Sequence, residues 1–271
     1  MMRSLWTAAS GMTSQQLNVD NISNNLANVN TTGFKKERIE FKSLLYQTMS
    51  RATQDEANTG GRPVNLQVGH GVRPMATMRS FAQGSMQSTE NPLDFVIQGE
   101  GFFSVQLSED QVVYTRDGSF KVSNDGNEYT LVTNDGYPIL GADGEPISFS
   151  NEYSVESLSV GPLGEIFAFD GAEQVDTGLQ IGLSQFPNRQ GLEAIGDNFY
   201  VETPASGEPI NEADGEVQSP SRIVQGFLEM SNVQIAQEMV NLIIAQRAYE
   251  LNSKAITTSD EMLQNANNLK R

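Results

Sequence analysis

The sequence predicts an α+β protein, in which an N-terminal and a C-terminal helix pair as a coiled coil and a mainly antiparallel β domain lies between them in the chain. Three observations lead to this prediction. Both ends carry apolar residues at heptad spacing, the middle carries a series of Asp-Gly pairs, and the net negative charge lies in the middle. We place the coiled-coil domain at residues 1–33 and 231–271, a linker or connecting region at residues 34–70 and the β-rich domain at residues 71–230.

The charge distribution separates the ends of the chain from its middle. Residues 1–33 carry one base and one acid, and residues 231–271 carry four of each, so both ends are neutral. Residues 34–70 carry six bases and four acids, whereas residues 71–230 carry six bases and twenty-five acids, a net charge of −19 that gives the chain its overall −17. Such acidity argues against nucleic acid or an anionic membrane as a main partner, because both would repel the chain.

The N-terminal segment predicts a helix over residues 3–30. A heptad frame that starts at Leu5 has apolar residues at seven of its eight seam positions: Leu5, Met12, Val19 and Leu26 in one set, and Ala8, Gln15, Ile22 and Val29 in the other. A seam this narrow is typical of a coiled coil. Gly11 weakens the helix by about 1 kcal/mol relative to alanine, so we expect the segment to gain order from partners.

The C-terminal segment predicts a longer helix over residues 231–271, which contain neither Gly nor Pro. Ser231 and Gln234 have the spacing of a capping box at its start. The predicted seam follows: Val240, Ile244, Ala248, Leu251, Ala255, Thr258, Met262 and Leu269. At 1.5 Å per residue this helix is about 60 Å long, so the N-terminal helix covers only part of its apolar stripe.

The middle of the chain predicts short antiparallel strands. Asp-Gly pairs, which favour tight hairpins, begin at positions 117, 125, 135 and 143, and the residues between them alternate in period two. Two more pairs begin at positions 170 and 214. Other expected strands lie at residues 94–97, 102–107, 154–160, 165–169, 180–186, 199–203 and 223–230.

Patterns that suggest chemistry are isolated in this sequence. Asp176-Thr177-Gly178 resembles an aspartic protease loop, but no second copy supplies the partner carboxylate, so we interpret it as a turn. The Asp-Gly repeats lack the ligand array of an EF-hand, and Gly99-Glu100-Gly101 lacks the third glycine of a nucleotide loop. The chain has no cysteine and one histidine, His70. We therefore predict no enzyme activity and no catalytic, cofactor or metal site.

Four blocks of sequence carry a resemblance to a known family. They are NNLANVNTTGFKKERIEF at residues 24–41, DFVIQGEGFFSV at residues 94–105, GLEAIGDNFYVET at residues 191–203, and the run from VQGFLEMSN to DEML at residues 224–263. In this order the chain resembles the bacterial flagellar rod and hook family. Residues 44–50 and 66–74 are more similar to the distal rod member than to hook protein. Two alternatives stay open: another rod subunit or hook protein, and an acidic, calcium-binding secreted β protein.

The resemblance implies a structural role. Subunits of this family stack helically into a hollow axle, with the terminal helices as an inner coiled coil and the β domain as the outer wall. The implied partners are further copies of the chain, proximal rod proteins, hook protein, the ring (bushing) proteins and the export apparatus, with no nucleic acid and no small-molecule substrate. The implied location is the rod that spans the periplasm. The absence of a signal peptide pattern at the start of the sequence leads us to expect export without a cleaved signal.

The residues that we expect to pack subunits together are the seam positions and the Asn-Leu-Ala-Asn block. They are Leu5, Met12, Val19, Ile22, Leu26, Asn28, Val29, Gly33, Phe34, Val240, Ile244, Leu251, Ala255 and Met262. Gly33 has a second interpretation, as the left-handed stop of the first helix, and the two are compatible. By its position, the polar segment from Ser43 to Leu66 corresponds to the segment that stiffens the rod in this family.

Overall fold

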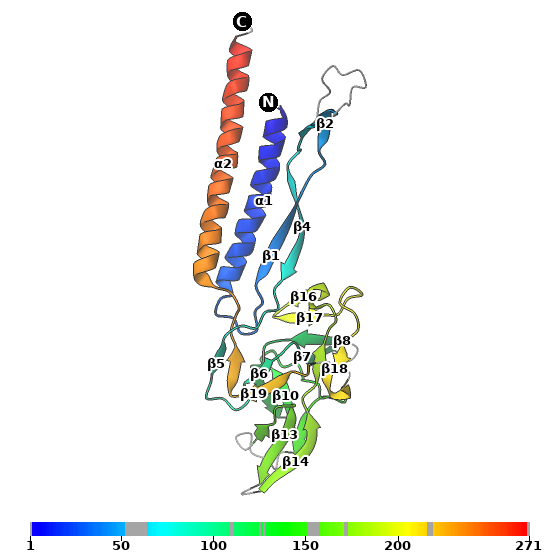
Figure 1. Ribbon diagram of the computed structural model, residues 1–271. Helices are drawn as coiled ribbons and strands as arrows, with labels where there is room; N and C mark the ends of the chain where they lie inside the picture. The colour runs from blue at the N-terminus through cyan, green and yellow to red at the C-terminus, as the bar shows by residue number, and fades with distance from the viewer. Residues whose placement is uncertain are drawn as a thin grey trace. The chain divides into compact units, whose positions relative to one another are not determined.

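The computed structural model describes residues 2–51, 64–108, 111–124, 126, 128–150, 158–170, 173–215 and 219–269. Two helices and many antiparallel strands confirm the predicted α+β class (Figure 1). The chain divides into two compact units, which we describe separately. Unit 1 comprises Met1–Ala27, Glu37–Arg79 and Gln234–Arg271, and unit 2 comprises Asn28–Lys36 and Ser80–Val233.

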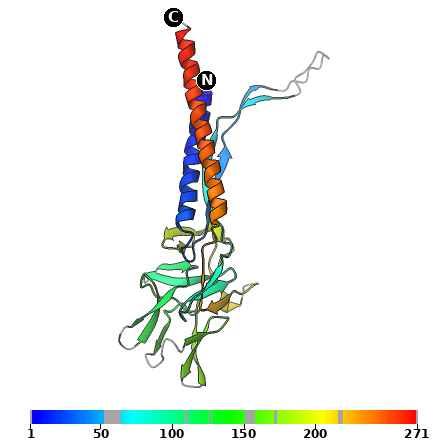
Figure 2. The ribbon, with the colours of Figure 1, turned by 90° about the vertical axis from the view of Figure 1, so that its left-hand side faces the viewer.

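Unit 1 contains two antiparallel helices that lie side by side, so that both termini lie at the same end of the pair (Figure 2). Helix α1 is Met2–Ala27 and helix α2 is Ile235–Asn268. The Ser4 and Ser259 hydroxyls are 3.3 Å apart, and a Cβ on Gly11 would lie 2.9 Å from Nδ2 of Asn252. These two pairs fix the antiparallel register. The close approach at Gly11 explains a residue that otherwise weakens α1.

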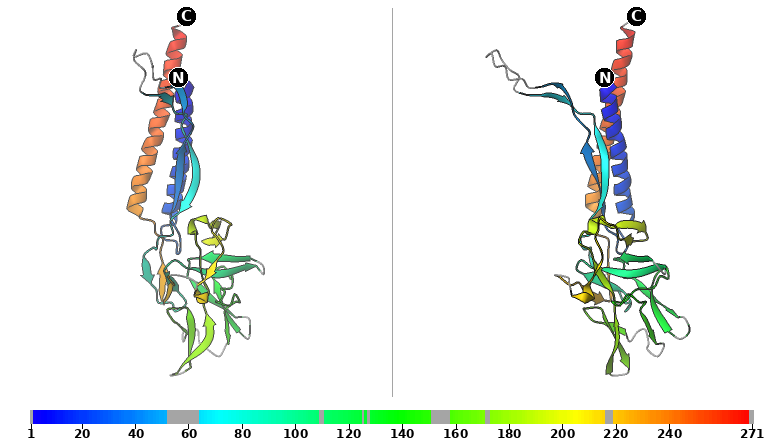
Figure 3. Two further views of the ribbon diagram at one scale, coloured as in Figure 1. Left: turned by 45° about the vertical axis from the view of Figure 1, so that its right-hand side comes forward. Right: turned by 90° about the vertical axis from the view of Figure 1, so that its right-hand side faces the viewer.

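A β ribbon completes unit 1, and its part formed by residues 37–43 and 72–79 lies along α1 (Figure 3). Strand β1 (Glu37–Ser43) pairs with β4 (Val72–Arg79), and β2 (Gln47–Ser50) pairs with β3 (Leu66–Val68), both antiparallel. The Asn25 side chain joins α1 to this ribbon: its Nδ2 donates to the Glu37 carbonyl at 2.8 Å, and its Oδ1 accepts from the Glu37 amide at 2.9 Å. Asn25 thereby fixes where the ribbon starts relative to the end of α1.

Unit 2 is built from short antiparallel strands. Two-stranded sheets pair β5 with β20 and β6 with β19, three-stranded sheets have the orders β11-β10-β9 and β12-β13-β14, and a six-stranded sheet has the order β16-β17-β8-β7-β15-β18. The strand bounds are β5 Met86–Ser88, β6 Phe95–Gln98, β7 Phe102–Ser108, β8 Gln111–Thr115, β9 Phe120–Asn124, β10 Glu128–Thr133, β11 Ser148–Ser150, β12 Leu158–Val160, β13 Glu165–Asp170, β14 Glu173–Gln180, β15 Leu183–Gln185, β16 Glu193–Gly196, β17 Phe199–Val201, β18 Ile210–Asn211, β19 Arg222–Gln225 and β20 Phe227–Glu229. Short 3-10 helices are η2 (Arg189–Gly191) and η3 (Glu212–Asp214).

The six-stranded sheet separates two apolar clusters in unit 2. Successive residues of a strand point to opposite faces, so Phe103 of β7 enters the larger cluster and Phe102 the smaller one. The smaller cluster is aromatic, with Phe81, Phe102 and Tyr200 in edge-to-face contact at ring-centroid distances of 5.4 to 6.0 Å. Apolar side chains therefore cover both faces of this sheet.

Several local predictions were wrong, each for a physical reason. Ser231 and Gln234 form no capping box: α2 starts after Gln234, which makes no side-chain cap bond, and the Ser231 hydroxyl instead accepts from the Val233 amide at 3.3 Å. Asp117-Gly118 is no hairpin, because β8 and β9 pair with other strands and a Cβ on Gly118 would lie 1.8 Å from the Phe95 carbonyl oxygen. Asp176-Thr177-Gly178 forms a bulge inside β14 rather than a turn.

The expected strands also need two corrections. The run at residues 223–230 is two strands, because Gly226 has a φ of +76° and separates β19 from β20. The run at residues 180–186 is likewise divided between the end of β14 and β15. Of the strand expected at residues 154–160, the described part is β12, and the rest lies outside the described residues. The meander around residues 120–133 is confirmed, with β9 and β10 antiparallel.

Candidate functional site: an exposed helix face and a buried connector

The predicted seam of α1 lies against its own unit. Ala8 and Ile22 are buried, and Leu5, Met12, Val19 and Leu26 are half-buried. The large apolar side chains that α1 exposes are others, namely Met2, Trp6 and Leu17. The α1 seam is therefore already covered within a single chain.

The predicted seam of α2 lies on an exposed face. The exposed fractions are 50% for Val240, 62% for Ile244, 68% for Leu251 and 54% for Met262, and Ala255 is also exposed. At 3.6 residues per turn these five positions form one stripe along the helix, which we call the outer stripe. The chain does not bring the outer stripe into contact with the α1 seam, contrary to the arrangement in which the two seams lie opposite each other.

A different stripe of α2 faces α1. Its buried members are Glu238 and Ala245, and its half-buried members are Asn241, Leu242, Ala248, Asn252, Ile256, Ser259 and Leu263. This inner stripe lies about a quarter turn around the helix from the outer stripe. It is rich in small and polar residues, so an apolar periodicity does not reveal it. The feature of the sequence that could have indicated this helix contact is Gly11, because a glycine in a helix permits another helix to approach closely.

The block at residues 28–36 belongs to unit 2, beyond the end of α1. Asn28, Val29 and Phe34 are half-buried, and Gly33 is buried. Gly33 lies six residues after the last residue of α1, so the interpretation as a helix stop was wrong, although its φ of +68° is left-handed. Its amide donates to the Glu229 carbonyl at 2.8 Å, and a Cβ there would lie 2.6 Å from the Asp117 amide nitrogen.

Further hydrogen bonds hold this block in unit 2. Nδ2 of Asn198 donates to the Thr32 carbonyl at 2.9 Å, the Lys36 amide donates to Oδ1 of Asn232 at 2.8 Å, and the Ser80 amide donates to the Lys36 carbonyl at 2.9 Å. Asn198 adopts a φ of +60° in the tight turn between β16 and β17, a conformation that asparagine tolerates. Segments far apart in the chain therefore converge on residues 28–36.

A buried ionic cluster lies beside the block and was missed by sequence reasoning. Nζ of Lys35 is 2.6 Å from Oε1 of Glu229, and Nη1 of Arg116 is 3.6 Å from Oε2 of the same carboxylate. All three side chains are 1% exposed. Burial is the main cause that lowers the pKa of both Lys35 and Arg116. Lys35 and Glu229 are 194 positions apart, and no local pattern links residues at such a separation.

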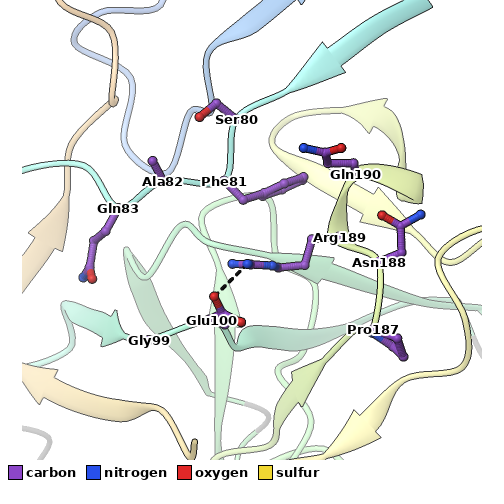
Figure 4. Close-up of a pocket in the computed structure, with 10 residues that line it drawn as sticks. All are labelled: Ser80, Phe81, Ala82, Gln83, Gly99, Glu100, Pro187, Asn188, Arg189 and Gln190. Carbon is purple, nitrogen blue, oxygen red and sulfur yellow. Dashed lines mark hydrogen bonds and ion pairs between the residues drawn. The ribbon is translucent and has the colours of Figure 1, made fainter.

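Unit 2 also has a polar cavity of 610 Å³ (Figure 4). Phe81, Gln83, Gly99, Pro187 and other residues line it. Across it, Nη2 of Arg189 donates to Oε1 of Glu100 at 2.7 Å, so its charged groups neutralise each other. The two charged residues that line the cavity are thus paired with each other, and the described residues around it present no free charge that would attract a charged ligand.

Over the described ranges, no group of three or more His, Asp or Glu side chains could hold a metal ion. In the same ranges no helix is long and apolar enough to cross a membrane. His70 lies exposed between β3 and β4, and Gly99 to Gly101 join β6 to β7.

Of the segment from Ser43 to Leu66, residues 52–63 lie outside the described residues. The described flanks include β2 and the start of β3. Their apolar side chains are exposed, at 89% for Leu45, 59% for Tyr46 and 56% for Leu66. The role predicted for this segment is taken up below as a proposal.

Family models match three parts of the chain. A model described as flagella basal body rod protein matches residues 5–35, a flagellar hook protein FlgE/F/G D1 domain matches residues 96–168, and a flagellar basal body rod FlgEFG protein C-terminal model matches residues 224–269. All three describe proteins of the bacterial flagellum. The outer stripe of α2 and residues 28–35 both lie within matched regions.

Relatives that align over the full length of the chain are likewise flagellar basal-body rod proteins. The chain is 50% identical over 273 residues to the flagellar basal-body rod protein FlgG of Borreliella burgdorferi, with all of both chains covered. It is 43% identical to FlgG of Caulobacter vibrioides (99% of this chain and 100% of the relative) and 40% identical to FlgG of Bacillus subtilis (100% of both). The chain therefore belongs to the flagellar basal-body rod protein family, whose members are structural proteins and not enzymes.

Proposed function

We propose that copies of this chain associate through the outer stripe of α2 and build a helical homopolymer. The chain is a structural subunit of the distal rod of the flagellar basal body. In the proposed polymer the terminal helices of neighbouring copies pair as a coiled coil, with residues 1–33 and 231–271 as the inner domain. Residues 34–70 are the linker and residues 71–230 the outer domain. These sequence-based bounds differ from the compact units of the single chain, in which residues 28–36 belong to unit 2 and residues 37–79 to unit 1.

The observation that carries this proposal is the exposure of the outer stripe. Ile244 and Leu251, near the middle of α2, are 62% and 68% exposed in the single chain. Full burial of a large aliphatic side chain contributes about 1.5–3 kcal/mol. Soluble monomers rarely leave a long contiguous apolar stripe uncovered. A second copy of the chain is the partner that the full-length family relationship favours.

The charge distribution supports close packing through the helices. Residues 231–271 are net neutral and residues 71–230 carry a net charge of −19. Copies that meet through their helices can keep the mutually repulsive β domains farther from the contact. A main contact between β domains would instead bring their like charges together.

We also propose the wider role that the family relationship suggests. The polymer is a hollow axle that transmits torque from motor to hook and conducts exported subunits. It contacts proximal rod proteins, hook protein and the ring (bushing) proteins. The chain reaches the periplasm through the flagellar export apparatus without a cleaved signal peptide.

Electron microscopy of the concentrated, purified chain tests the polymer directly. We expect straight hollow filaments, and a far-UV circular dichroism signal that shows helix gained on polymerisation, because a helix whose apolar face is uncovered is only marginally stable by itself. A chain that stays monomeric at all concentrations, with both termini resistant to proteolysis, would contradict the proposal.

A deletion tests the role proposed for the segment from Ser43 to Leu66. We propose that this segment contacts neighbouring subunits and prevents them from sliding. The exposed Leu45, Tyr46 and Leu66 on its flanks supply apolar surface for such contacts. Deletion of residues 51–62 should leave polymerisation intact and give more curved filaments in electron micrographs. Filaments as straight and stiff as those of the parent would rule the role out.

A further inference from the structure

The proposed assembly makes no use of the ionic cluster formed by Lys35, Arg116 and Glu229. Oε1 of Glu229 accepts from Nζ of Lys35 at 2.6 Å and from the Gly84 amide at 2.7 Å. Nζ of Lys35 also donates to the Ala82 carbonyl at 3.1 Å. The cluster therefore joins the early block at residues 28–36 to the end of β20, inside one unit.

The cluster holds two cations and a single anion. Nη2 of Arg116 donates to the Gly99 carbonyl at 2.8 Å, and the guanidinium lies 5.0 Å from the centre of the Phe102 ring. Nε and Nη1 of Arg116 and Oε2 of Glu229 have no hydrogen-bond partner within the described part of the chain. Glu229 is therefore the counterion on which the burial of both cations depends.

Without Glu229 the docked block would be strongly unfavourable. The Asn198–Thr32 and Ser80–Lys36 hydrogen bonds involve residues that precede Glu229 in the chain and could form before it is available. Such neutral hydrogen bonds contribute modestly to stability, whereas the burial of an unpaired ammonium and guanidinium costs far more. The two hydrogen bonds alone would not hold the block in place.

We infer that Glu229 is a charge gate: residues 28–36 dock into unit 2 only after Glu229 has taken its place between Lys35 and Arg116. A chain that emerges from its N-terminus keeps this early block undocked until β20, 194 positions after Lys35, is available. Residues 28–36 therefore dock into unit 2 only when most of the chain is present. This inference concerns the single chain and does not depend on polymerisation.

Limited proteolysis of the full chain tests the gate. Trypsin cleaves after Lys36, whose backbone is held on both sides by hydrogen bonds in the closed unit. Glu229→Gln keeps the size of the side chain and removes its charge. We expect cleavage after Lys36 to become roughly 100-fold faster, because proteolysis follows the population of the open state. Cleavage at the parent rate would overturn the inference.

A triple variant separates charge from shape. Lys35→Met, Arg116→Met and Glu229→Gln together remove every formal charge of the cluster and leave the cleavage site after Lys36. We expect the cleavage rate to return to within roughly tenfold of the parent, since no unpaired ion is then buried. A triple variant as labile as Glu229→Gln alone would show that the gate is not electrostatic.

A matched control uses an ion pair of the same type at the surface. Arg247 and Glu250 are 2.8 Å apart and 73% and 62% exposed. Glu250→Gln should leave cleavage after Lys36 unchanged, because exposed pairs contribute little. A rate increase as large as that of Glu229→Gln would overturn the inference, because loss of any carboxylate would then suffice.

The order of events is tested by pulse-labelled hydrogen exchange during refolding of the full parent chain. The Ser80 amide reports docking of Lys36, and the Gly84 amide reports arrival of the Glu229 carboxylate. The gate requires that both amides gain protection in the same phase, or Gly84 first. Protection of Ser80 ahead of Gly84 would overturn it.

Discussion

Leu251→Asp is expected to abolish polymerisation and swimming while leaving the single chain folded. Leu251 is 68% exposed on α2, so an aspartate at this position stays hydrated in the monomer. In the proposed polymer the same position is buried against another copy. Each contact would lose about 1.5–3 kcal/mol of apolar burial and would in addition bury an unpaired carboxylate. Sedimentation and electron microscopy of the purified variant measure the loss.

Two further variants sharpen this experiment. Gln246→Asp puts the same charge on an exposed position about 140° around α2 from Leu251 and should still polymerise. Leu26→Asp replaces a half-buried residue that packs inside unit 1, so it should abolish polymerisation and also reduce the helix content of the monomer. Polymerisation of Leu251→Asp, or a motile strain that carries it, would contradict the role of the outer stripe.

The two helices show what the spacing of apolar residues can and cannot predict. The sequence correctly predicted two helices, α1 and α2. Three of their four observed ends lie within a few residues of the predicted ends. The heptad pattern also found the face of α1 that is covered. It did not show which face of α2 meets α1, because that face mixes a few large apolar residues with small and polar ones such as Ala245, Ala248 and Asn252. Periodicity reports where apolar residues lie, and small residues set where two helices approach closely.

The buried cluster shows what a sequence pattern cannot supply. Lys35 lies in the conspicuous block at residues 24–41, yet lysine side chains are ordinarily exposed. Its burial depends on Glu229 and Arg116, which β20 and the segment after β8 bring together from distant parts of the chain. Strand pairing determines these contacts, and hairpin signals such as Asp-Gly report only neighbouring strands. The hairpin at Asp117-Gly118 was wrongly predicted for the same reason, because β8 and β9 pair with other strands and not with each other.

Gly33→Ala is expected to destabilise unit 2 by about 2–5 kcal/mol. A non-glycine residue at a φ of +68° costs about 1–2 kcal/mol. The added Cβ would also lie 2.6 Å from the backbone nitrogen of Asp117, and such overpacking costs about 1–3 kcal/mol. The Asp117 backbone follows the buried Arg116, so little room exists for it to move. Urea unfolding of the full chain, followed by tyrosine fluorescence, measures the change.

Gly215→Ala is the matched control, because it isolates the steric part of the Gly33 effect. Gly215 has a φ of +72°, yet a Cβ there would meet no atom of the described residues within 4 Å. It should therefore cost only the backbone part, about 1–2 kcal/mol. If the two variants lose the same stability, the close contact with Asp117 is not what requires glycine at position 33. If Gly33→Ala loses more and also exposes the bond after Lys36 to trypsin, tight docking of residues 28–36 depends on that contact.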